Sequence, residues 1–87
     1  MSRNRLEKFI AELAALAKDI CPEAIIKIST NSLEGEDARM EILVPSDAFD
    51  AVDEAVVKRA DEILDDEGYL IVAMVFEKEQ VGALQAD

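Results

Sequence analysis

The chain has 87 residues, of which 51% are apolar and 33% are charged, and its 20 acidic and 9 basic side chains leave a net charge of −11. This length suits one small domain, residues 1–87, and the apolar share is typical of a globular chain. The charge disfavours nucleic acids and anionic membranes as partners, since both are negative. Without histidine, and with one cysteine, the chain lacks His-based acid–base catalysis and any internal disulfide. We therefore expect neither a metal nor a cofactor.

The N-terminal segment has apolar side chains spaced three and four residues apart, which predicts an amphipathic helix from Asn4 to Ile20 that stops before Pro22. Cys21 is interpreted as a small, half-buried apolar side chain, with a reactive thiol as the alternative. The start of the chain lacks the continuous apolar segment of a secretory signal. No stretch reaches the roughly 20 apolar residues that span a bilayer. We expect a cytoplasmic protein.

Two alternating, β-branched segments follow, Ala24 to Thr30 and Ala38 to Val44, and they predict a β-hairpin. The polar connection between them, Asn31 to Asp37, contains a glycine. An antiparallel register that sets base against acid is favourable, and it pairs Lys27 with Glu41 and Ser29 with Arg39.

The next segment predicts a long helix from Ser46 to Glu67, which ends at Gly68. Its outer face is strongly acidic. Two interpretations of this face are open: it imitates nucleic-acid charge and binds a basic protein, as an inhibitor does, or it keeps a small protein soluble. The acidic surface that a basic partner would meet consists of Asp50, Asp53, Asp61 and Asp65.

The last predicted strand, Tyr69 to Phe76, is almost wholly apolar, as in strands that are buried on both faces. We assign the side that carries Met74 to the core, so that Ile71 and Val75 face away from the helices. The tail, residues 78–87, is expected to fray or to form one short helical turn.

These segments predict an α+β fold of order α-β-β-α-β: a two-layer sandwich in which both helices cover one face of a three-stranded mixed sheet. The other sheet face would then carry an uncovered apolar patch, which is typical of an association surface. We expect a homodimer through this patch, and the alternative is a C-terminal segment that folds back over it. The predicted interface residues are Ile25, Leu43, Ile71 and Val75.

Two short stretches of this layout are Ile28-Ser29-Thr30 and Arg39-Met40-Glu41-Ile42-Leu43-Val44. They and the order of elements resemble, over most of the chain, the minimal nucleotidyltransferase domain of the polymerase-β superfamily. The first stretch stands at that family's Gly-Ser turn, and the second stands at its Asp-x-Asp strand. The resemblance implies phosphoryl transfer at a site where closely spaced carboxylates hold two metal ions.

The catalytic positions depart from that family's pattern. Arg39 and Ala73 stand where two of the three carboxylates would be, so Glu41 alone is kept. Ser29 replaces a glycine, whereas Thr30 keeps a hydroxyl. The resemblance thus implies a catalytically degenerate member, and the alternative is that any domain with this element order would align equally well. We expect a non-enzymatic interaction or regulatory module, with an enzyme centred on Glu41 as a less favoured class.

Overall fold

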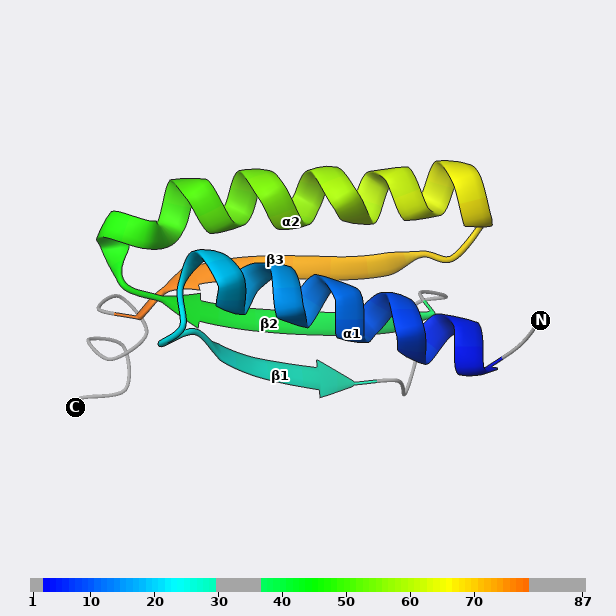
Figure 1. Ribbon diagram of the computed structural model, residues 1–87, viewed down its shortest axis with the longest axis horizontal. Coiled ribbons are helices and arrows are strands. Elements are labelled where there is room, and N and C mark those ends of the chain that lie inside the picture. The colour runs from blue at the N-terminus through cyan, green and yellow to red at the C-terminus, as the bar shows by residue number, and fades with distance from the viewer. Residues whose placement is uncertain (1–2, 30–36, 79–87) are drawn as a thin grey trace.

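The elements of the structure follow the predicted order (Figure 1). The computed structural model describes residues 3–29 and 37–78, and within these ranges the order is α-β-β-α-β. The elements are α1, Arg3–Ile20; β1, Ile25–Ser29; β2, Ala38–Val44; α2, Ser46–Glu67; and β3, Ile71–Glu77. The α+β class is therefore confirmed. The predicted hairpin connection up to residue 36 and the tail beyond residue 78 lie outside the described residues.

The end of α2 shows how the sequence sets an element's bounds. Gly68 has a φ of 79°, the left-handed conformation that glycine adopts without steric cost. Its N–H donates to the carbonyl oxygens of Ile63 at 3.2 Å and Leu64 at 3.0 Å. These bonds satisfy carbonyl groups that the helix end would otherwise leave unpaired. The chain then turns directly into β3.

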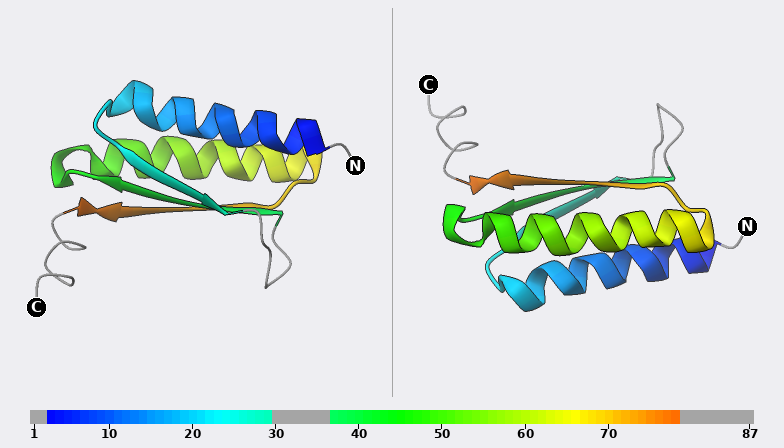
Figure 2. Two further views of the ribbon diagram at one scale, coloured as in Figure 1. Left: turned by 90° about the horizontal axis from the view of Figure 1, so that it is seen from below. Right: turned by 90° about the horizontal axis from the view of Figure 1, so that it is seen from above.

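The sheet has the strand order β1-β2-β3, with β1 antiparallel to β2 and β2 parallel to β3. The predicted hairpin register is confirmed, since Lys27 pairs with Glu41 and Ser29 pairs with Arg39. Both helices lie on the same face of this mixed sheet, and Figure 2 shows the described segments leaving the other face open. We call this uncovered side the open face.

The hydrophobic core fills the space between the helices and the covered face of the sheet. Met40, Ile42 and Val44 of β2 point into it and have no exposed surface. The rings of Phe9 and Tyr69 also meet there, with centroids 5.6 Å apart. Its members are Phe9, Ile10, Leu13, Ala17, Cys21, Ala24, Ala38, Met40, Ile42, Val44, Val52, Val56, Ala60, Ile63, Tyr69 and Ile71.

The predicted orientation of β3 is wrong. Ile71 is 4% exposed and belongs to the core, and Val75 packs against the core. Their β2 partners, Ala38 and Ile42, are themselves core residues. Paired residues on neighbouring strands share a face. The open face therefore carries the alternate residues of β3, which are Val72, Met74 and Phe76.

Polar contacts join neighbouring elements within each layer: Asp37 links two strands of the sheet, and two ion pairs link the two helices. The Asp37 carboxylate accepts the Leu70 N–H at 2.8 Å, and the Asp37 N–H donates to the Leu70 carbonyl at 2.8 Å. This fixes the start of β2 beside the start of β3. Arg5 pairs with Glu67, and Arg59 pairs with Glu12 at 2.5 Å and Glu62 at 3.3 Å. The pKa of Arg59 is raised, chiefly by its hydrogen bond with Glu12.

Candidate functional site on the open face of the sheet

The open face is a three-by-three array of side chains that the two registers define. Each row runs across β1, β2 and β3 in that order. The row nearest the C-terminal end of β2 is apolar, the middle row is mostly polar, and the third row is mixed. The rows are Ile25, Leu43 and Phe76; Lys27, Glu41 and Met74; and Ser29, Arg39 and Val72.

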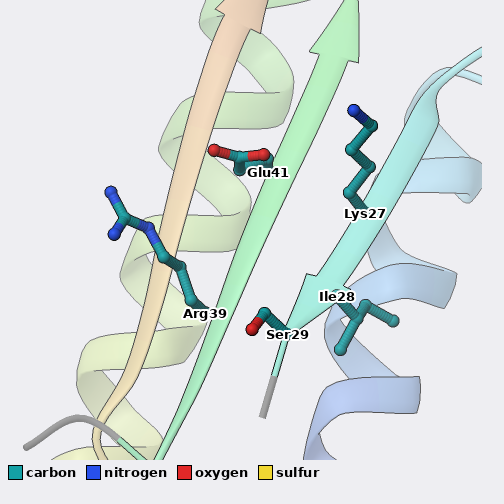
Figure 3. A pocket seen from close by; sticks show the side chains of 5 residues that line it. All are labelled: Lys27, Ile28, Ser29, Arg39 and Glu41. Carbon is teal, nitrogen blue, oxygen red and sulfur yellow. The ribbon is translucent and has the colours of Figure 1, made fainter. Parts of the chain in front are cut away.

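The polar residues of this array surround a shallow hollow of about 410 Å³, which is also lined by Ile28. In Figure 3, Arg39 and Glu41 reach from β2 towards β3, while Lys27 rises from β1 on the other side of the hollow. The Arg39 guanidinium donates to the Met74 sulfur at 3.3 Å. A thioether is a weak acceptor, so this bond leaves most of the donor capacity of Arg39 unused.

Lys27 and Glu41 lie opposite each other as predicted, but they do not form an ion pair. The two residues are cross-strand partners, yet the ion pairs among the described residues do not join their charged groups. Lys27 is exposed and Glu41 is half-buried. Glu41 is thus a carboxylate at the centre of the open face with its charge unneutralised by a neighbour in the described chain.

The charge of the open face differs from that of the molecule. Its nine residues carry two basic groups, Lys27 and Arg39, and one acidic group, Glu41, which gives +1 against −11 for the chain. The acidic excess lies elsewhere, above all on the outer face of α2. Asp50, Asp61 and Asp65 are exposed there, and Asp53 is half-buried.

The structure brings together only some of the catalytic positions that the family resemblance indicates. Ser29, Arg39 and Glu41 share the open face. Ala73 does not, because it pairs with Met40 and faces the helices. Thr30 lies outside the described residues. The open-face residue beside Glu41 on β3 is Met74, and it offers no carboxylate. The sequence-based prediction that Met74 faces the core is therefore wrong.

The structure places two of the four predicted interface residues on the open face. Ile25, which is 45% exposed, and Leu43 lie on the open face, whereas Ile71 and Val75 do not. The apolar open-face residues that sequence reasoning missed are Val72, Met74 and Phe76. No local signal separates them from the residues on the other face, because every residue from Ile71 to Phe76 is apolar.

Three further findings concern metal binding, membrane spans and similarity to known proteins. The described residues contain no group of three or more Cys, Asp or Glu residues that could hold a metal ion. Neither of the two described helices contains an apolar stretch of the length that a membrane span requires. The chain matches no known protein family, no curated protein and no solved structure.

Proposed function

We propose that this protein is a non-enzymatic interaction module that forms a homodimer through the open face of its sheet. The observation that carries the proposal is the composition of that face. Five of its nine side chains are apolar, Ile25, Leu43, Val72, Met74 and Phe76, and no described segment covers them. An apolar sheet face that lacks a covering layer is typical of an association surface.

The charge distribution makes the open face the side through which two copies of the chain repel each other least. Two molecules of charge −11 repel each other wherever their acidic surfaces meet. The open face, at +1, is a side on which two copies can approach while the acidic faces of α2 point away from each other. The proposal of a non-enzymatic role is supported by Glu41, since it is the one carboxylate among the nine open-face residues.

The small size of the open face favours a weak dimer. Strands about 4.8 Å apart, with same-face residues about 7 Å apart, give a projected area of roughly 300 Å² for a three-by-three array. Stable interfaces bury about 800 Å² on each partner, and smaller ones are weak or transient. We therefore propose a reversible dimer with a Kd in the micromolar range.

Sedimentation equilibrium over a dilution series is the direct test. We expect a mass near twice that of the monomer at high concentration, falling towards the monomer below the Kd. Because the charge outside the interface is repulsive, raising the salt from about 0.1 M to about 1 M shortens the screening length from about 10 Å to about 3 Å and tightens the dimer. A monomer at every concentration would disprove the proposal.

The exposure of Asp50, Asp61 and Asp65 supports a second candidate, an inhibitor that binds a basic protein through the outer face of α2. Attraction between an acidic and a basic surface weakens when salt screens it. The two candidates therefore respond to salt in opposite directions. Binding to a basic protein that persists in the monomeric state, and that high salt abolishes, would favour the acidic surface of α2 over the open face.

A further inference from the structure

The polar centre of the open face restricts how two copies can pack. A charge that is buried in an interface needs a partner, because an unpaired buried charge is strongly unfavourable. Glu41 stands at the centre of the array, with Arg39 two residues away on the same strand. Neither has a described ion-pair partner within its own chain. Any dimer through this face must therefore neutralise them across the interface.

The simplest symmetric dimer has a two-fold axis that lies between the two sheets. If the axis runs along the strands and stacks β2 on its copy, each Glu41 meets the Glu41 of the second copy. If it runs across the strands, midway between Arg39 and Glu41, each strand lies antiparallel over its own copy. Glu41 then meets the second copy's Arg39, and the contact occurs twice.

This second arrangement also matches the rest of these two rows, while the apolar row of Ile25, Leu43 and Phe76 lies beyond the part of the array that the two copies share. The axis that sets Glu41 over Arg39 of the second copy sets Lys27 over Ser29 and Met74 over Val72, since each pair is also two residues apart on one strand. The Glu41 carboxylate meets a guanidinium, the exposed Lys27 ammonium meets a hydroxyl, and Met74 meets Val72. Arginine suits such a position because its planar guanidinium binds a carboxylate through two hydrogen bonds.

We propose that the dimer is antiparallel, with β2 stacked on β2 and with reciprocal Glu41–Arg39 ion pairs that fix its register. This inference rests on the proposed dimer and adds its geometry. The half-burial of Glu41 and the weak sulfur contact of Arg39 in one copy are consistent with groups that gain their partners on association.

Charge exchange within one chain tests this geometry. Glu41→Arg and Arg39→Glu should each weaken dimerisation at least about tenfold, because each sets like charges against one another. The double variant E41R/R39E restores opposite charges in the antiparallel register alone, and its Kd should return to within about threefold of that of the unaltered chain. Sedimentation equilibrium measures all four proteins, and circular dichroism verifies their folding.

A matched pair of neutral variants serves as the control. Arg39→Gln and Lys27→Gln each remove one positive charge from the open face. Arg39→Gln should weaken the dimer about tenfold, whereas Lys27→Gln should change its Kd less than threefold, because Lys27 faces a serine hydroxyl. A dimer of the unaltered chain that tolerates both single reversals, or that the double variant fails to restore, would overturn the geometry alone. A monomeric unaltered chain would overturn the proposed function.

Discussion

Ile71→Lys should unfold the protein, whereas Val72→Lys, one residue further along β3, should leave it folded and monomeric. Ile71 is 4% exposed in the core, so the substitution removes a buried side chain worth about 2 kcal/mol and places an ammonium group where it has no partner. An 87-residue protein has a free energy of unfolding of roughly 4–13 kcal/mol, and a buried unpaired charge costs a large part of it.

Val72 lies on the open face and is half-buried in one copy. A lysine there can extend into solvent, so the expected change in the free energy of unfolding is within about 1 kcal/mol. In the proposed dimer, however, the same ammonium lies against the apolar Met74 side chain of the second copy. The expected loss of dimer affinity is at least about a hundredfold.

Circular dichroism melts and sedimentation equilibrium on both variants give the two readouts. Val72→Ala is the control, since it shortens the side chain without adding charge and should keep a weakened dimer. If Val72→Lys unfolded the protein and Ile71→Lys kept its fold, β3 would present the opposite face to the helices. If both variants folded and remained dimeric, the open face would not be the dimer interface.

The contrast between β2 and β3 shows how far the sequence predicts this fold. In β2, Arg39 and Glu41 alternate with Met40 and Ile42, so polarity alone separates the core side from the open side. In β3, every residue from Ile71 to Phe76 is apolar, so alternation carries no information about its faces. Its orientation follows from the parallel register with β2, which depends on where α2 returns the chain.

The residues of the candidate site also differ in how far the sequence predicts their positions. Its β1 and β2 members are close in sequence, and charge pairing alone predicted their register, including Lys27 opposite Glu41. The contact between Arg39 and Met74 joins residues 35 positions apart, and no local pattern predicts it. Likewise, placing Ala73 at a catalytic position required a face that only the register of β3 determines.

Leu13→Ala is the second substitution with a large expected effect, and it tests whether α1 is an integral part of the core. Leu13 lies in the middle of α1 and is fully buried. Removing the larger part of a buried leucine leaves a cavity as well as a transfer penalty, which together cost about 3 kcal/mol. Urea denaturation of the Val72→Lys monomer, with and without Leu13→Ala, measures this loss without the stabilisation that dimerisation adds.

Leu64→Ala makes the same chemical change on the surface and is the matched control. Leu64 lies on α2 and is 41% exposed, so its truncation should cost less than about 1 kcal/mol. Equal losses at Leu13 and Leu64 would mean that α1 is not packed on the core. The helix side of the sheet would then also be partly uncovered. Either side of the sheet could in that case act as the association surface, and an uncovered apolar face would no longer single out the open face.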